Sequence, residues 1–178
     1  MTIGMLIRSD LHRYSGKVSV SAFVFNYFYN RSFKYSFWFR LAQQKGFWGL
    51  LAKVKLKLLI WKTGIDIPPG TTIGPGFSIG HGQSMVVNPT TIIGSNCNIS
   101  QFVSIGSNHD AAAQIGDNVY IGPNVCIVEN VKIGNNVTIG AGAVVTKDIP
   151  DNATVAGVPA RILNFDNPGR YVINRWAA

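Results

Sequence analysis

A lone histidine, His81, stands in the segment SIGHGQSMVV (residues 78–87), where neighbouring segments carry isoleucine followed by glycine. An imidazole titrates near neutral pH and can take the proton from a hydroxyl group, which is a poor nucleophile until it loses that proton. Asp66 lies 15 residues before His81. A carboxylate beside the second ring nitrogen would fix the tautomer and stabilise the charged ring. These two residues predict a base and its orienting acid, without a nucleophile supplied by the protein.

Each of the two residues also has a plain structural alternative. His81 would then be an exposed histidine on a turn, and Asp66 would cap the beginning of the first repeat. A metal site is not expected, because the chain has only three histidines and one of them, His12, lies far outside the repetitive part of the sequence.

An aliphatic residue recurs every six positions, usually followed by glycine. The three series are Ile67, Ile73, Ile79, Met85; Val87, Ile93, Ile99, Ile105; and Ile115, Ile121, Ile127, Ile133, Ile139, Val145. This period fits neither a helix nor simple strand alternation. Each hexad is one short strand and a turn, and three hexads close a triangular coil that must stack on others to bury its apolar face. The sequence predicts a mainly β fold, a left-handed parallel β-helix of about five coils, whereas a β-sandwich would not explain a fixed spacing of six.

The hexads slip in two places, near Gln83–Val86 and at SNHDAAAQ (residues 107–114). Insertions into a solenoid form loops on one face, which is often the binding face. The second insertion lies one to two coils after His81, so its loop is expected to project toward the level of the histidine.

Composition divides the chain into three parts. Residues 1–63 are predicted to form an α-helical, aromatic and basic extension, residues 64–163 the β-helix, and residues 164–178 a C-terminal tail. Charged residues make up only 13% of a chain with a formal net charge of +8. So little charge predicts surface hidden in an oligomer or against a membrane. The charge alone is compatible with nucleic-acid binding, but no motif supports it, so no nucleic-acid partner is expected.

Residues 47–62, FWGLLAKVKLKLLIWK, are predicted to form an amphipathic helix. Its stripe consists of Leu50, Val54, Leu58 and Trp61, with the lysines off the stripe. The stripe either packs against the β-helix and other subunits or contacts an anionic membrane surface. No stretch reaches about 18 uninterrupted apolar residues, the N-terminus has no signal pattern, and Cys97 and Cys126 have no metal or disulfide spacing. We expect a cytoplasmic protein with reduced thiols, or one that is peripheral at the inner face of the membrane.

The hexads, the IGHG histidine and the segment IGAGAVVTKDIPDNATVAGVPARIL (residues 139–163) resemble the hexapeptide-repeat acyltransferases, and most closely the serine acetyltransferase group with its polysaccharide O-acetyltransferase relatives. The resemblance covers residues 64–163 well and the N-terminal part weakly. The spacing of Asp66 and His81, the glycine at Gly106 and the AGVPAR segment carry it.

The resemblance implies a homotrimer that uses acetyl-CoA, with His81 as general base and Asp66 as its orienting acid. A backbone N–H of Gly106 or Ser107 would hold the oxyanion. Coenzyme A would lie between subunits, beside the wall residues Gly122, Ala141 and Gly142 and the cations Lys147 and Arg161.

The chain departs from the serine enzymes at the acceptor. Gly80 stands where they have an aspartate that binds the ammonium group of serine, and the loop after Gly106 offers His109 where they have an Arg-His pair. Asp10 is a candidate for their second amine-binding acid. These departures favour a sugar hydroxyl of a surface polysaccharide or its precursor as acceptor. Serine O-acetylation for cysteine biosynthesis is the alternative, and a non-catalytic β-helix scaffold is the alternative of another class.

Overall fold

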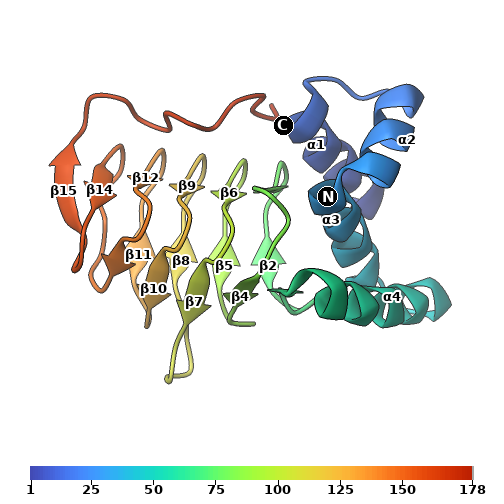
Figure 1. Cartoon of the computed structure of the whole chain (residues 1–178), viewed down its shortest axis with the longest axis horizontal. Helices are drawn as coiled ribbons and strands as arrows, with labels where there is room; N and C mark the ends of the chain where they lie inside the picture. Colours follow the sequence, from blue (N-terminus) through green and yellow to red (C-terminus); the bar gives the residue numbers. More distant parts are fainter. Residues whose placement is uncertain (178) are drawn as a thin grey trace.

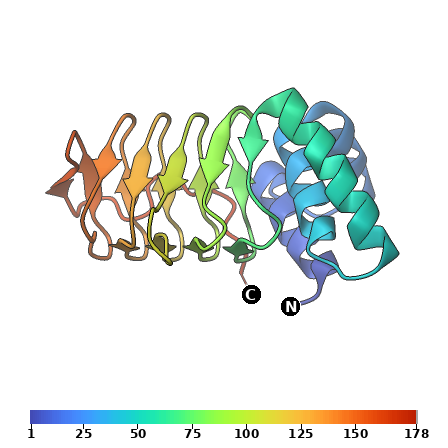
Figure 2. The same cartoon turned by 90° about the horizontal axis from the view of Figure 1, so that it is seen from below.

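Four helices precede a parallel β-solenoid in the computed structural model, which describes residues 1–177. The helices are α1 (Ile3–Ser15), α2 (Val20–Tyr29), α3 (Arg31–Ala42) and α4 (Phe47–Thr63). They gather at one end of the solenoid axis, where both chain ends also lie (Figures 1 and 2). The predicted β-helix with an α-helical N-terminal extension is confirmed.

Three sheets form the walls of the solenoid. The first sheet contains β1 (Ile65–Asp66), β4 (Met85–Val87), β7 (Ser104–Gly106), β10 (Cys126–Val128) and β13 (Val144–Val145). The second contains β2 (Thr72–Ile73), β5 (Ile92–Ile93), β8 (Gln114–Ile115) and β11 (Lys132–Ile133). The third contains β3 (Ser78–Ile79), β6 (Asn98–Ile99), β9 (Tyr120–Ile121), β12 (Thr138–Ile139), β14 (Thr154–Ala156) and the antiparallel β15 (Arg161–Asn164).

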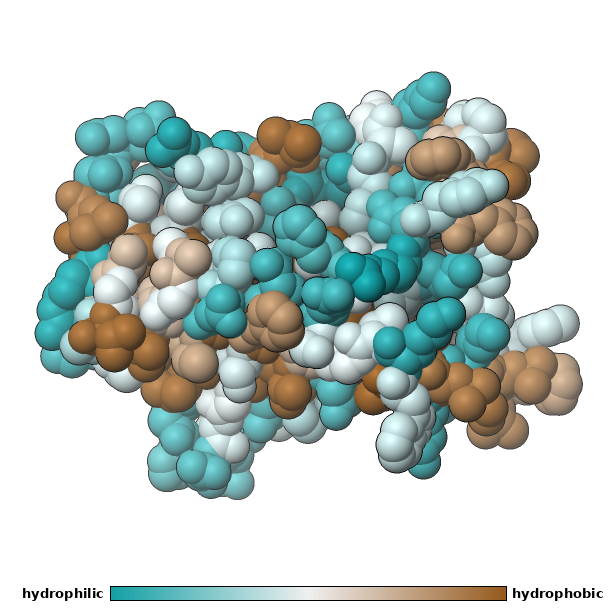
Figure 3. Space-filling model, viewed as in Figure 1, coloured by the Kyte–Doolittle hydropathy of each residue, from teal (hydrophilic) through white to brown (hydrophobic). Residues whose placement is uncertain are grey.

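The aliphatic residue of every hexad is buried, whereas the residue before it is exposed or half-buried in every hexad except at Thr138. Ile99, Ile121, Ile127 and Ile139 are fully buried. One corner turns through a left-handed residue in successive coils, and the amides of Asn118 and Asn136 each donate to the asparagine one coil further on, at 3.0 Å. Asparagine suits this corner because it tolerates positive φ and forms a ladder through its side chain. In the view of Figure 3, apolar side chains gather most at the two ends of the molecule.

The two slips in the repeat are insertions at different corners. Paired residues in adjacent coils are ordinarily three hexads apart, as Val86 and Ser104 are. The pairs Ile65–Met85 and Ser104–Cys126 are further apart in sequence, because each of them spans an insertion. The first insertion lies in the turn after β3, and the second is the loop between β7 and β8. The solenoid absorbs both without losing its register.

The helices close the open end of the first coil with side chains. Tyr35 Oη accepts a hydrogen bond from the Ile67 N–H at 3.1 Å, and Tyr14 Oη accepts one from the Ile79 N–H at 2.8 Å. Arg40 donates to the carbonyls of Ile73 and Gly74, both at 2.7 Å. These contacts satisfy backbone groups that an exposed strand edge would leave open to another chain.

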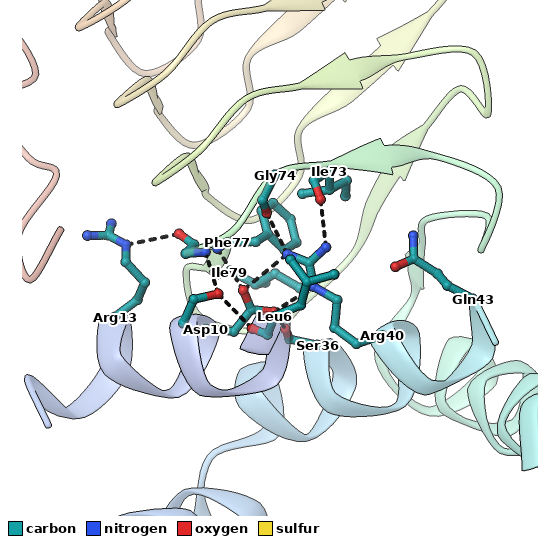
Figure 4. A network of polar contacts seen from close by, with 12 residues as sticks. Leu6, Asp10, Arg13, Ser36, Arg40, Gln43, Ile73, Gly74, Phe77 and Ile79 are labelled. Atoms are coloured by element: carbon teal, nitrogen blue, oxygen red, sulfur yellow. Dashed lines mark hydrogen bonds and ion pairs between the residues drawn. The ribbon is translucent and has the colours of Figure 1, made fainter. Parts of the chain in front are cut away.

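Asp10 and Arg40 lie at the centre of this contact (Figure 4). Both side chains are at most 1% exposed, and Arg40 Nε lies 2.9 Å from Asp10 Oδ2. Asp10 also accepts hydrogen bonds from Ser36 Oγ at 2.5 Å and from the Phe77 N–H at 2.9 Å. The helical extension is therefore joined to the first coil through a buried, fully hydrogen-bonded ion pair.

The C-terminal segment after β15 runs back along the solenoid to the helices (Figure 1). The Tyr171 carbonyl accepts from the Asn98 amide at 3.1 Å, and the Trp176 N–H donates to Asn96 Oδ1 at 2.7 Å. The Asn174 amide reaches the Arg13 carbonyl at 3.3 Å. The segment thus spans the whole array and contacts α1.

Candidate functional site

His81 lies on the third corner, the set of turns that follow β3, β6, β9 and β12. Later turns at this corner have one residue with positive φ: Phe102, Asn124 or Gly142. The turn after β3 has two, His81 with φ 59° and Gly82 with φ 54°. The insertion therefore pushes an exposed imidazole outward from a corner that is otherwise tightly wound.

Helix α3 holds this turn from the other side. Arg31 Nε donates to the His81 carbonyl oxygen at 2.8 Å, and the Gly82 N–H donates to the Gly80 carbonyl at 2.8 Å. A Cβ added to Gly82 would lie 2.8 Å from Ser32 Oγ, so only glycine fits beneath the first turn of α3. His81 therefore has a fixed backbone, whereas its exposed side chain forms no hydrogen bond or ion pair with the described residues 1–177.

A hollow of about 510 Å³ adjoins the imidazole. Its walls come from α1, α2, α3 and β3, and the residues are Tyr14, Phe25, Tyr29, Asn30, Arg31, Ser32, Ser78, Ile79 and His81. Arg31 is the charged member of this set, and no carboxylate lines the hollow. Sequence reasoning missed Arg31, Tyr29 and Tyr14, because only the folded chain brings these helical residues to the turn.

Asp66 lies on the outer face of the first sheet, exposed, at the end of β1. It lines a different groove, of about 490 Å³, which runs along the first sheet past Asn88, Gly106, Ser107 and Glu129. The predicted oxyanion donors Gly106 and Ser107 therefore share a groove with Asp66.

Asp66 and His81 do not meet within one chain. Across residues 1–177 no hydrogen bond or ion pair joins them, and they line separate hollows. The expectation that one coil would bring them face to face is wrong for the single chain. The reason is that β1 places Asp66 on a flat face, whereas the insertion carries His81 out of the third corner.

Glu129 organises the loop beside the groove, a role that the sequence analysis missed. Its Oε2 accepts hydrogen bonds from Ser107 Oγ at 2.9 Å and from the Asn108 N–H at 3.3 Å. His109 Nε2 lies 3.6 Å from the same oxygen, with its side chain 76% exposed. Ser107 Oγ in turn accepts from the His109 N–H at 3.0 Å. The carboxylate thus fixes the segment that carries Ser107 and His109.

Two predicted acceptor residues have structural roles. Asp10 is buried in its ion pair with Arg40 and lines neither hollow, so the single chain exposes no carboxylate there, and its role as an amine-binding acid stays a prediction. All its oxygens are taken up in joining the helices to the first coil. Gly80 lies beside His81, and its N–H donates to the Ile99 carbonyl at 2.7 Å.

The predicted coenzyme A residues do not all share one surface. Gly122, Ala141 and Gly142 follow β9 and β12, so they lie on the third corner, in line with His81. A Cβ on Gly142 would meet nothing within 4 Å, whereas one on Gly122 would lie 2.8 Å from the Ile139 carbonyl. Arg161 is exposed on β15 of the adjoining third sheet. Lys147 is exposed after β13, at a different corner.

A family model and similar proteins of known sequence and structure all point to the same family. The family model "Bacterial transferase hexapeptide (six repeats)" matches residues 112–147. The chain is 38% identical over 105 residues to a serine acetyltransferase of Synechococcus elongatus and 34% identical over 117 residues to one of Bacillus pumilus. These matches cover 57% and 64% of this chain, and 43% and 54% of the two relatives. The chain therefore spans about half the length of these curated relatives.

Solved structures extend the similarity into the helices. A serine acetyltransferase of Neisseria gonorrhoeae in complex with serine is 31% identical, with a TM-score of 0.73 over 89% of this chain and 68% of that one. A serine acetyltransferase of Brucella abortus is 29% identical, also with a TM-score of 0.73, over 90% of this chain and 68% of that one.

Proposed function

This chain belongs to the serine acetyltransferase-like hexapeptide-repeat acyltransferases, and from that premise we propose that it transfers an acetyl group from acetyl-CoA to a hydroxyl group. One observation carries the proposal: His81, exposed at the third corner, has its backbone held by Arg31 and borders a hollow large enough for a small acceptor. A scaffold without activity would not need an insertion that moves one histidine out of the wall.

In the proposed reaction, an imidazole nitrogen of His81 takes the proton as the acceptor oxygen attacks the thioester carbonyl. A new C–O bond forms and the carbonyl becomes an oxyanion, for which a backbone N–H at Gly106 or Ser107 is the donor we propose. When the intermediate collapses, the C–S bond breaks and the imidazolium returns its proton to the departing thiolate of coenzyme A. The histidine is regenerated, and no covalent enzyme intermediate forms.

Asp66 and His81 are separated within one chain, but a homotrimer could bring Asp66 of one subunit close to His81 of the next. Both residues are exposed and belong to the same coil, so they lie at the same height along the solenoid. Three copies around an axis parallel to the solenoid would bring a flat face of one beside the corner of the next. We propose that His81 receives its orienting carboxylate from Asp66 of the partner subunit, and that the oxyanion donors come from that same face.

Acetyl-CoA fits best along the third corner. Ala141 and Gly142 are exposed there, and the space beside Gly142 is open. Arg161 is the nearer candidate for a phosphate, because its β15 strand belongs to the sheet beside that corner. Lys147 would reach the same ligand only across the subunit boundary.

Serine is the acceptor that the relatives favour, and one of the similar structures is described as a complex with serine. A serine carboxylate has a ready partner in the guanidinium of Arg31. This identification replaces the sugar acceptor as the first candidate.

A glycan hydroxyl is the second candidate, for a specific reason. The hollow beside His81 has no carboxylate that would balance the ammonium group of serine, since position 80 is glycine and Asp10 is committed to Arg40. An anionic or neutral sugar would not need that charge, and Arg31 would bind an acidic one.

The experiment is a thiol-release assay with acetyl-CoA. Serine, neutral oligosaccharides and uronic-acid oligosaccharides are compared as acceptors, and the products are identified by a mass increase of one acetyl group. Acetylserine formation supports the first candidate, and an acetylated sugar the second. No acceptor-dependent release with any of them, and no shift in Tm with coenzyme A, would overturn the proposed function.

A further inference from the structure

Helix α4 has two apolar faces, and only one of them contacts the rest of the chain. Gly49, Ala52 and Leu56 are buried against the molecule. The opposite side consists of Phe47, Leu50, Val54, Leu58 and Trp61, whose exposed fractions lie between 57% and 82%. At 100° per residue these five side chains fall within an arc of about 80°. The predicted stripe therefore exists but does not pack on the solenoid of its own chain.

Lysines border this outer stripe on both sides. By the same helical geometry, Lys53 and Lys57 lie along one edge, and Lys55 and Lys62 along the other. All four are exposed, and α4 has no acidic residue. In the described part of the chain none of the four forms an ion pair. A helix with an apolar stripe, terminal aromatics and lysines along both edges has the pattern of one that lies in a membrane interface.

The surroundings of α4 add to this surface. Trp48 and Leu51 of α4, with Phe23, Tyr27, Phe37 and Trp38 of α2 and α3, line a hollow of about 390 Å³. Five of its eight lining residues are aromatic, and the others are Leu41, Leu51 and Gln44. Phe25 and Phe28 of α2 are also exposed, at 62% and 65%. Of the two apolar ends visible in Figure 3, the one on the right, where the helices lie, is thus built from several helices.

The charge of the helices decides which occupant suits this surface. Eleven of the 16 lysines and arginines lie in residues 1–63, but only one of the eight acidic residues, Asp10, lies there. Asp10 is buried against Arg40, so the helical surface presents no free carboxylate. A second copy of the same surface would place lysines against lysines, whereas an anionic lipid surface complements them.

We propose that α4 docks this protein onto an anionic lipid bilayer, with Phe47, Leu50, Val54, Leu58 and Trp61 inserted at the interface and the four lysines among the headgroups. No helix in the described residues is long and apolar enough to cross a membrane, so the contact is peripheral. The proposed membrane contact does not depend on the proposed acetyl transfer, because it uses only the surface of the helices.

The test is flotation of the full chain with phosphatidylcholine vesicles, with and without phosphatidylglycerol. We expect binding to the anionic vesicles only, and a partition coefficient that falls about tenfold or more in Lys53→Gln/Lys57→Gln and in Leu58→Ser/Trp61→Ser. The matched controls are Lys132→Gln and Ile173→Ser, which alter exposed residues on the solenoid and the C-terminal segment and are expected to leave partitioning unchanged.

Three results would overturn the proposal. They are no binding to either vesicle, equal binding to both, and equal loss in the control variants. Sedimentation without lipid distinguishes the other occupant: an assembly that Leu58→Ser/Trp61→Ser splits in half, with no vesicle binding, would assign the stripe to a second copy instead.

Discussion

Arg40 and Asp10 form a two-pronged ion pair at the boundary between helices and solenoid, with Nε–Oδ2 at 2.9 Å and Nη2–Oδ1 at 3.1 Å. Each partner also bonds the backbone of the first coil, Asp10 to the Phe77 N–H and Arg40 to the carbonyls of Ile73 and Gly74. The pair therefore acts as a joint between two parts of the chain.

Removing one partner of this joint leaves the other charge buried without compensation. We expect Arg40→Met to lower the free energy of unfolding by about 3–5 kcal/mol, because an isolated buried carboxylate is costly. Urea unfolding at a fixed protein concentration measures the change. Arg8→Met, which alters an exposed arginine on the same end of the molecule, is the control and should change stability little. Equal effects of the two variants would show that the joint adds nothing.

His81→Asn tests the proposed general base without disturbing its turn. Asparagine tolerates the left-handed backbone at φ 59°, so the fold should persist while the base is lost. We expect kcat to fall by about 10²–10⁴-fold, the usual contribution of a general base. Steady-state thiol release gives the value, and His12→Asn serves as control. Activity within a few-fold of the unaltered protein would remove His81 from the mechanism.

Mixed trimers test whether Asp66 serves a neighbouring subunit. His81→Asn and Asp66→Asn are each expected to be nearly inactive as pure proteins. When the two are co-expressed, some interfaces combine an intact His81 with an intact Asp66 from the adjacent subunit, so activity returns. Differently tagged chains and tandem purification isolate the mixed species. If the mixture is no more active than its parents, the proposed pairing across the interface fails.

Glu129 is expected to control the order of the loop beside the groove. Its carboxylate accepts two hydrogen bonds from Ser107 and Asn108, and charge-assisted bonds of this kind resist local opening. In Glu129→Ala the amides of residues 107–109 should exchange hydrogen about tenfold faster, which is about 1.4 kcal/mol of local stability. Glu129→Gln keeps the length of the side chain and the backbone cost of φ 63°. Its amide exchange rates should therefore lie between those of the unaltered protein and those of Glu129→Ala. Unchanged exchange in both variants would contradict the role.

Stability should fall in alkaline solution. Burial raises the pKa of the Cys97 thiol to about 12, and burial also raises the pKa of the hydroxyls of Tyr14 and Tyr35. These groups ionise more readily in the unfolded chain, so their contribution is present below pH 9 and is lost as the pH rises toward the folded values. Each costs up to about 1.4 kcal/mol per pH unit within that window. Urea unfolding between pH 8 and 11 tests this, and Cys97→Ala should reduce the slope. A flat profile would contradict the prediction.

The period of six was sufficient to predict the solenoid, because burial alternates with the hexads and the corners need residues that accept positive φ. The same logic located both insertions. It could not place Asp66 relative to His81, since the two-residue insertion after β3 changes where the imidazole points without changing the pattern of apolar residues.

The residues missed by the sequence analysis come from elements that share no period with the solenoid. Arg31, Tyr14 and Arg40 lie 33 to 65 residues away from the parts of the first coil that they contact, in helices whose docking depends on tertiary packing. Asp10 was a candidate amine-binding acid only through the resemblance of its segment to the family. Such a resemblance cannot distinguish a carboxylate that faces a substrate from one that faces a buried arginine.

The returning C-terminal segment changes the mechanics of the array. A stack of coils is ordinarily a row of nearest-neighbour contacts, free to fray from its far end one rung at a time. Here the chain that leaves the last coil bonds to Asn98, then to Arg13 of α1 and then to Asn96. A loosened terminal coil must therefore break these contacts beside the helices before it can unravel. Both ends of the solenoid are thereby secured at a single place, the helical cap.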